Sequence, residues 1–88
     1  MNANGFKNAA EERERLRAFR MREKIAAEIV KDAPMFAASI AMALRLHGEQ
    51  LTKDADEFAG VPGHEHLAVA QQRNAEYLTE LAEEIEGR

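Results

Sequence analysis

Three histidines are the residues of this chain whose types most readily suggest chemistry. His64 and His66 flank Glu65, a triplet of metal-binding residue types. Two histidines share a helical face when they lie four residues apart, so this closer spacing suits only an extended turn. The remaining histidine, His47, and scattered carboxylates provide no second ligand pair. We interpret the triplet as a surface turn, and we predict no metal site.

Catalytic residues are equally sparse. The single serine, Ser39, lies in an apolar stretch and lacks the flanking glycines of a nucleophile elbow. The chain has no cysteine, no glycine-rich phosphate loop and no paired-histidine zinc motif. A helical bundle this small is expected to leave no room for a pocket of several hundred Å3, the usual size for a substrate. The sequence therefore predicts neither an enzyme nor a bound cofactor.

Basic side chains are the stronger signal, and most of them lie in the first third of the chain. At helical spacing, five cations fall within about 60° of one another: Arg13, Arg17, Arg20, Lys24 and Lys31. Arginine and aromatic residues often dominate protein–protein contacts. We predict a partner-binding surface made of five residues: Arg13, Arg17, Phe19, Arg20 and Lys24.

Two other interpretations of these cations stay open. They could pair within the chain with the acidic residues Asp54, Asp56 and Glu57, or they could contact the phosphates of a nucleic acid. Arg15 and Arg22 interrupt what would otherwise continue the apolar face of the same helix. The first half of this helix is therefore expected either to project beyond the core or to meet carboxylates.

The distribution of charge is uneven. The net charge of -4 hides a basic half and an acidic half. Residues 1–46 hold nine Lys and Arg against six Asp and Glu, whereas residues 47–88 hold three against ten. Such asymmetry indicates electrostatic association. The acidic total and a pI of 5.4 favour a protein partner with an acidic surface over a nucleic acid.

The elements that must position these residues are predicted to be helices. A chain of 88 residues has room for one domain, and its abundant alanine and sparse Gly and Pro disfavour a sheet. Asn8 and Asp32 are candidate N-caps, and the run from Gly60 to Gly63 predicts a turn. We expect a flexible leader over residues 1–8 and a single helical domain over 9–88. Within that domain the helices are expected at about 9–32, 34–59 and 64–86.

The apolar spacing of the last two helices indicates how they pack. The helix over 64–86 carries a coiled-coil-like seam with Asn74 at its centre, where a polar residue sets register or oligomeric state. The helix over 34–59 carries one stripe that includes His47, an expected core or interface histidine. A second stripe of Met35, Met42 and Leu46 lies on its opposite side and needs cover of its own. We predict a homodimer whose interface contains Met35, Met42, Leu46 and Asn74.

Taken together, the sequence predicts an all-α protein, an elongated antiparallel bundle of three helices. Its expected function is non-enzymatic protein–protein interaction, as a small adaptor, regulator or inhibitor of a larger protein. A nucleic-acid-binding module and a purely structural homo-oligomer are the alternatives. No signal peptide and no long apolar run are present, so we expect a cytoplasmic protein without membrane contact.

Overall fold

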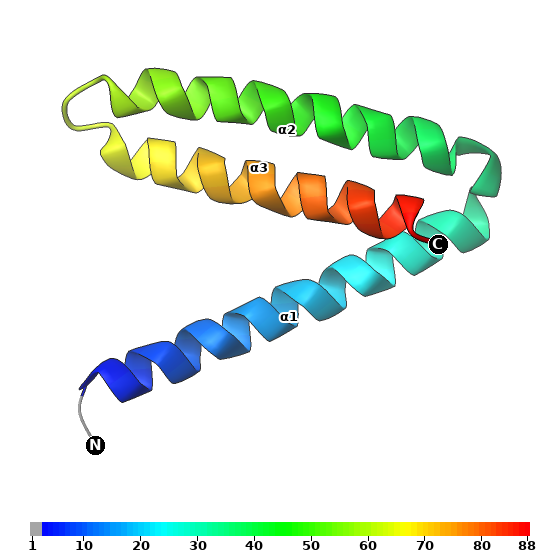
Figure 1. Cartoon of the computed structure of the whole chain (residues 1–88), viewed down its shortest axis with the longest axis horizontal. Coiled ribbons are helices and arrows are strands. Elements are labelled where there is room, and N and C mark those ends of the chain that lie inside the picture. The colour runs from blue at the N-terminus through cyan, green and yellow to red at the C-terminus, as the bar shows by residue number, and fades with distance from the viewer. Residues whose placement is uncertain (1–2) are drawn as a thin grey trace.

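The computed structural model describes the backbone of residues 3–88 and the side chains of residues 8–88. It contains α1 (Ala3–Asp32), α2 (Ala37–Ala59) and α3 (Glu65–Glu86), and a short 3-10 turn (Pro34–Phe36) joins α1 to α2 (Figure 1). The described residues contain no strand. The prediction of an all-α fold with three helices is confirmed.

The start of α1 differs from the prediction. The helix begins at Ala3, so Asn8 lies inside it and is not its N-cap. The physical reason is that residues 3–8 contain no proline, and the one glycine costs a helix only about 1 kcal/mol relative to alanine. Of the predicted leader over 1–8, residues 1–2 lie outside the described part of the chain.

The connection between α1 and α2 is a tight corner. Asp32 remains the last residue of α1, and the backbone N–H of Ala33 still donates to the carbonyl of Ile29 at 2.8 Å. The predicted cap at Asp32 is therefore wrong, and Ala33 stands before Pro34 without a side-chain cap. Pro34 suits the first position of the 3-10 turn, because its missing N–H is not needed there.

The turn between α2 and α3 lies where the sequence predicts it. Gly60 follows the last residue of α2, and the backbone N–H of His64 donates to the carbonyl of Val61 at 3.1 Å. Gly63 has a φ of 87°, in the left-handed region that favours glycine. This turn reverses the chain, so α3 runs antiparallel to α2 along most of its length.

Small residues form the contact between α2 and α3. In α2 they recur at every seventh position, at Ala41, Gly48 and Ala55. In α3 the corresponding residues are Ala75 and Ala82, and all five are buried. A spacing of seven keeps one face of a helix toward its partner. Small side chains on that face allow the two backbones to approach closely, so the hairpin is stabilised by proximity rather than by large buried side chains.

Gly48 marks the closest approach. A Cβ placed there would lie 3.2 Å from the Thr79 hydroxyl oxygen and 3.3 Å from the Ala75 carbonyl oxygen. That hydroxyl also donates to the Ala75 carbonyl at 2.9 Å, which limits how far it can move. Glycine at this position costs α2 some helix propensity, but a side chain there would force Thr79 or Ala75 to shift by a few tenths of an ångström.

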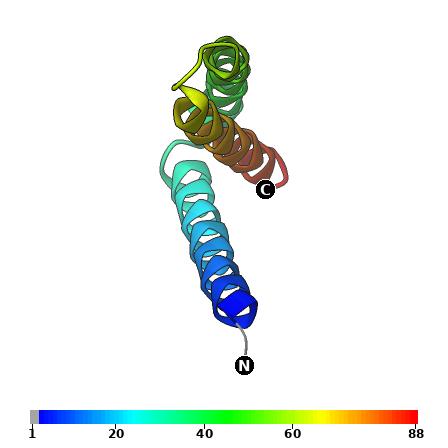
Figure 2. The same ribbon diagram turned by 90° about the vertical axis from the view of Figure 1, so that its left-hand side faces the viewer.

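The second half of α1 packs against α3 and completes a small core. Ala26 of α1 is fully buried beside residues of the other two helices, namely Ala41, Leu81, Ala82 and Ile85. Ile25, Ile29 and Val30 pack around this cluster. In both views α3 lies between α1 and α2 (Figures 1 and 2). The first half of α1 diverges from α3 and leaves the bundle.

The divergence of α1 makes the molecule broad and thin. Its radius of gyration is 15.8 Å, compared with about 12 Å for a compact chain of this length. Its extents are 46 × 37 × 14 Å, and a helix with its side chains measures about 10–12 Å across. The three helices thus form a single layer, with no second layer to cover its faces.

An ion pair fastens the start of α2 to the end of α3. Nε and Nη2 of Arg45 each donate to a carboxylate oxygen of Glu86 at 2.8 Å. These hydrogen bonds lower the pKa of the Glu86 carboxyl from its ordinary value of 4.5, and they raise the pKa of Arg45. The pair is exposed, so it acts as a fork-to-fork clamp at the surface rather than as a core contact.

We expect Gly48→Leu to lower the thermal midpoint of unfolding. The added side chain would overlap Thr79 and the Ala75 carbonyl, and overpacking of this kind costs about 1–3 kcal/mol. Circular dichroism melts measure the effect, with Lys53→Leu on the exposed side of α2 as control. Equal midpoints for the two variants would contradict the close approach.

The Arg45–Glu86 pair predicts a dependence of stability on acid. A lowered pKa in the folded state stabilises the protein above pH 4.5, and this contribution is lost as the pH falls through the folded-state pKa of Glu86. Near neutral pH, we expect the wild type to have a higher thermal midpoint of unfolding than Glu86→Gln. The difference between the two midpoints should shrink below pH 4.5. Melts of Glu49→Gln, whose carboxylate is also exposed, are the control. A difference that does not shrink at all as the pH falls from 7 to 2 would contradict the assignment.

Candidate functional site

The first part of α1 has few contacts with the rest of the chain. We call residues 8–24 the arm. Its apolar side chains are about half exposed, at 47% for Leu16, 45% for Phe19 and 50% for Met21. Six basic and four acidic residues surround them. The sequence left open whether this half projects or meets carboxylates, and the structure shows that most of it projects.

The outer side of the arm carries the predicted basic stripe. Arg13, Arg17, Arg20 and Lys24 are all exposed, and their helical positions fall within about 60° of one another. None of the four lines the cleft between α1 and α3. We call these four residues the outer stripe. From Arg13 to Lys24, twelve residues, it is about 16 Å long, which suits an elongated contact.

Phe19 does not belong to the outer stripe. It lies about 160° around the helix from Arg17 and lines the cleft on the inner side of the arm. The five residues predicted as one partner-binding surface are therefore divided between two faces of α1. Sequence proximity suggested a single surface, but two residues that are two positions apart in a helix point to nearly opposite sides.

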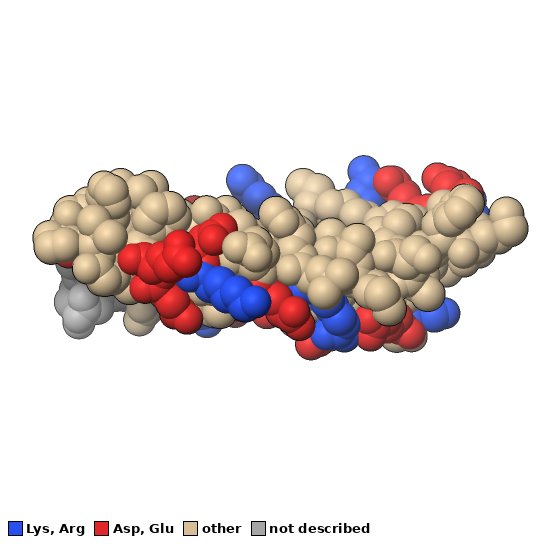
Figure 3. Space-filling model, turned by 90° about the horizontal axis from the view of Figure 1, so that it is seen from above, with Lys and Arg blue, Asp and Glu red and all other residues tan. Residues whose placement is uncertain are grey.

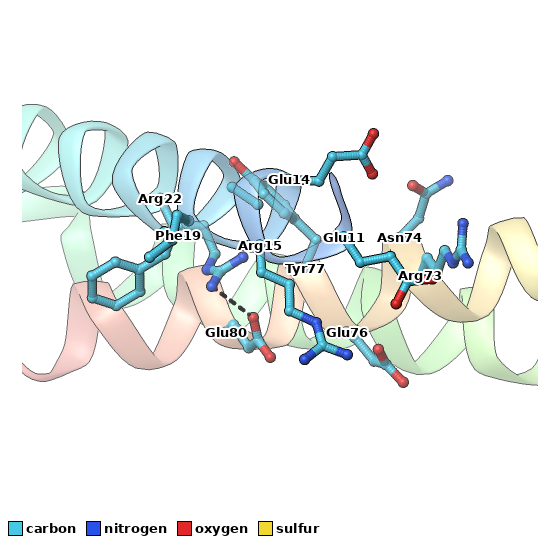
Figure 4. Close-up of a pocket in the computed structure, with 12 residues that line it drawn as sticks. Glu11, Glu14, Arg15, Phe19, Arg22, Arg73, Asn74, Glu76, Tyr77 and Glu80 are labelled. Atoms are coloured by element: carbon cyan, nitrogen blue, oxygen red, sulfur yellow. Dashed lines mark ion pairs between the residues drawn. The ribbon is translucent and has the colours of Figure 1, made fainter. Parts of the chain in front are cut away.

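The inner side of the arm faces α3 across a wedge-shaped cleft of about 810 Å3 (Figure 4). The prediction that the bundle lacks a pocket of this size is wrong, because α1 diverges from α3. The lining is predominantly charged, with four carboxylates and three guanidinium groups. They are Glu11, Glu14, Arg15, Arg22, Arg73, Glu76 and Glu80.

Arg22 closes the narrow end of this cleft. Its Nη2 lies 3.0 Å from a carboxylate oxygen of Glu80, and its guanidinium carbon lies 5.3 Å from the ring centroid of Tyr77. Figure 4 shows the Arg22 side chain reaching from α1 to Glu80 on α3. The side chain of Arg22 is only 15% exposed, so the cation–π contact is partly desolvated and strengthened. This contact lies at the boundary between the packed second half of α1 and the arm.

Neither Tyr77 nor Glu80 is marked by the sequence alone. The available signal was the position of Arg22, which interrupts the apolar face of α1 and therefore needs a partner. The spacing of residues cannot say which of sixteen carboxylates supplies that partner. Only the packing of α1 beside α3 selects Glu80.

Pairing of the basic cations with Asp54, Asp56 and Glu57, which the sequence left open, does not occur among residues 8–88. Within residues 8–88, the ion pairs join Arg22 to Glu80, Arg45 to Glu86 and Arg88 to Glu84. The reason is topological, since α3 lies between α1 and the end of α2 (Figure 1). Asp54, Asp56 and Glu57 lie on α2 and the outer stripe lies on α1, the two helices that α3 separates.

The histidines and the serine stand apart from the arm. His47 is exposed, not a core residue of the α2 stripe, because Gly48 and not His47 faces α3. His64 precedes α3, and its ring packs edge-on against Phe58 with centroids 6.1 Å apart. Ser39 is exposed. Across residues 8–88, no three His, Asp or Glu side chains gather closely enough to hold a metal ion.

The four residues predicted for an oligomer interface also separate. Met42 and Leu46 are exposed on the side of α2 opposite Gly48, and Met35 is exposed in the 3-10 turn before α2. Asn74 is exposed on α3 and lines the cleft, so it is not the centre of a buried seam. The buried face of α3 runs instead through Ala75 and Ala82. Asn74 therefore shares no surface with the other three.

No family model, curated protein or solved structure matches this chain. Among the residues that the structure describes, none of the helices combines the length and apolar character that a membrane crossing requires.

We expect Arg22→Ala to loosen the arm. Loss of the contacts with Tyr77 and Glu80 should lower the free energy of unfolding by about 1 kcal/mol, a modest value because Glu80 is half exposed. Amide hydrogen exchange should speed up over residues 15–24. Arg20→Ala on the outer stripe is the matched control. Identical exchange in the two variants would show that Arg22 does not anchor α1.

Proposed function

We propose that this protein is a non-enzymatic protein–protein interaction module of the cytoplasm, which binds a larger protein with an acidic surface through the outer stripe. The observation that carries this proposal is the exposure of the arm. Seventeen residues of continuous helix make up the arm, and the four cations of its outer stripe form no ion pair with the rest of the described chain. Such a segment contributes little to folding, so its pattern is explained best by an external contact.

The arrangement of the outer stripe supports an acidic partner. Its four cations stand one turn apart on a helix that is already formed, so binding would not have to order the backbone. Arginine also forms bidentate pairs with carboxylates. Met21, which does not line the cleft, lies beside the stripe and offers an apolar contact next to the charges. The mode is that of a helix laid against a groove or another helix.

The same four cations would also suit phosphate groups, which keeps a nucleic-acid-binding module as the alternative. Glu12 and Glu23 stand next to the cations in the sequence, and carboxylates at that distance weaken attraction to a polyanion. The two functions differ in their salt dependence. For binding to duplex DNA, a plot of the logarithm of the binding constant against the logarithm of the salt concentration has a slope of about -0.9 per neutralised phosphate.

We expect the triple variant Arg13→Glu/Arg17→Glu/Arg20→Glu to lose partner capture. In an affinity capture from a lysate of the source cells, read by mass spectrometry, the wild type should retain a protein that the variant does not. Circular dichroism should show unchanged helix content, because these side chains are exposed.

The control is Lys31→Glu/Lys53→Glu/Arg73→Glu, which has the same net charge but leaves the cations of the arm in place. If the control loses partner capture to the same extent, the effect is due to the change in net charge and not to the outer stripe. Loss of helix content in the first variant would show the outer stripe to be structural. Retention of DNA at low salt by the wild type alone would favour the alternative.

A further inference from the structure

The outward side of α2 and the 3-10 turn before it carry the most exposed large apolar side chains of the described chain. Met35 is 85% exposed, Phe36 59%, Met42 64% and Leu46 60%. Met42 and Leu46 project within about 40° of each other on the side of α2 opposite Gly48, and therefore opposite α3, and Met35 and Phe36 precede them in the 3-10 turn. We call these four residues the α2 outer face. Figure 3 shows broad uncharged surface over the first half of α2.

No charge would have to be buried to cover this face. Residues 33–44 contain no Lys, Arg, Asp or Glu. The first charged residue beyond them, Arg45, is directed toward α3 by its two hydrogen bonds with Glu86. An exposed apolar patch without charges is typical of an interaction site.

We propose that a second copy of this chain covers the α2 outer face, in a two-fold symmetric dimer with the two α2 helices antiparallel. With the axis midway between Ile40 and Ala41, Met35 stands opposite Leu46 of the second copy. Ser39 then stands opposite Met42 of the second copy, so the small residue accommodates the large one. Each contact occurs twice, and the interface is closed and self-complementary.

The area available agrees with a dimer of this kind. Taking about 200 Å2 for each side chain, the α2 outer face leaves roughly 500 Å2 exposed per copy, or about 1,000 Å2 for a symmetric pair. That value reaches the lower limit for a specific interface. The single chain exposes 6758 Å2, whereas a compact monomer of its mass exposes about 5,200 Å2. Pairing through α2 would cover part of this excess.

The dimer goes beyond the proposed function and uses a different surface. Because α3 separates α2 from α1, contact between two α2 helices leaves both arms exposed (Figures 1 and 2). Each dimer would present two outer stripes, and a partner with two acidic sites would bind more tightly through avidity. Partner capture and dimer formation can therefore fail independently.

Sedimentation equilibrium of the purified chain tests the dimer. We expect wild type to have twice the 9.9 kDa mass of one chain, and Met42→Glu to associate at least about ten-fold more weakly, since two carboxylates would meet near the axis. Val69→Glu, at a site 53% exposed on α3, is the matched control and should remain dimeric. Met42→Glu should still bind partners through its outer stripe.

Cross-linking gives a second test that needs only a mild substitution. The chain has no cysteine, so Ser39→Cys with a short bismaleimide should give a covalent dimer, whereas Gln72→Cys on α3 should not. A wild-type chain that sediments at 9.9 kDa at about 100 µM overturns the proposal. A dimer that withstands Met42→Glu but dissociates with Phe19→Glu also overturns it, because the second copy would then occupy the cleft.

Discussion

The close approach of α2 and α3 is the constraint on which the rest of the molecule depends. Alanine and glycine at every seventh position bring the two backbones together, and a side chain at Gly48 would press on Thr79 and the Ala75 carbonyl. Such a contact stabilises by many short van der Waals distances, not by large buried groups. Among residues 8–88 no large side chain is fully buried. The hairpin is therefore narrow, and it offers α1 only a short apolar surface.

That short surface explains why α1 is divided. Ala26 and its apolar neighbours cover the end of α3, where Leu81 and Ile85 provide the only large buried side chains of residues 8–88. Near the start of α3, the side that faces α1 is polar. It offers α1 no apolar surface to pack against, so α1 diverges from α3. Arg22 marks the change, because its aliphatic stem is buried while its guanidinium meets Tyr77 and Glu80. The arm and the cleft are consequences of this limit. The single layer of helices also leaves the outward side of α2 uncovered.

The candidate site could be predicted only in part. The alignment of Arg13, Arg17, Arg20 and Lys24 follows from helical spacing, and the structure keeps the four together on one exposed side. Phe19 is close to these four residues in the sequence, but its helical position puts it on a different side of α1 from Arg17. The pairing with Asp54, Asp56 and Glu57 depended on which helix lies next to α1, and spacing within single helices does not contain that information. Asn74 was placed in the seam because the apolar arc of α3 was centred on its large residues, whereas the contact runs through its alanines.

The sequence by itself determined the three helices, the turn at Gly60 to Gly63 and the end of α3, because propensity, glycine and proline act locally. It also determined the outer stripe and the uncharged run over residues 33–44, since both are regular patterns along one helix. Tertiary structure alone decided that Gly48 is a contact, that α3 lies between its neighbours, and that Arg22 pairs with Glu80. These depend on the distance between backbones and on the order of helices in the layer. Both are set by how small side chains fit together across an interface, and the residue pattern of one helix does not contain that information.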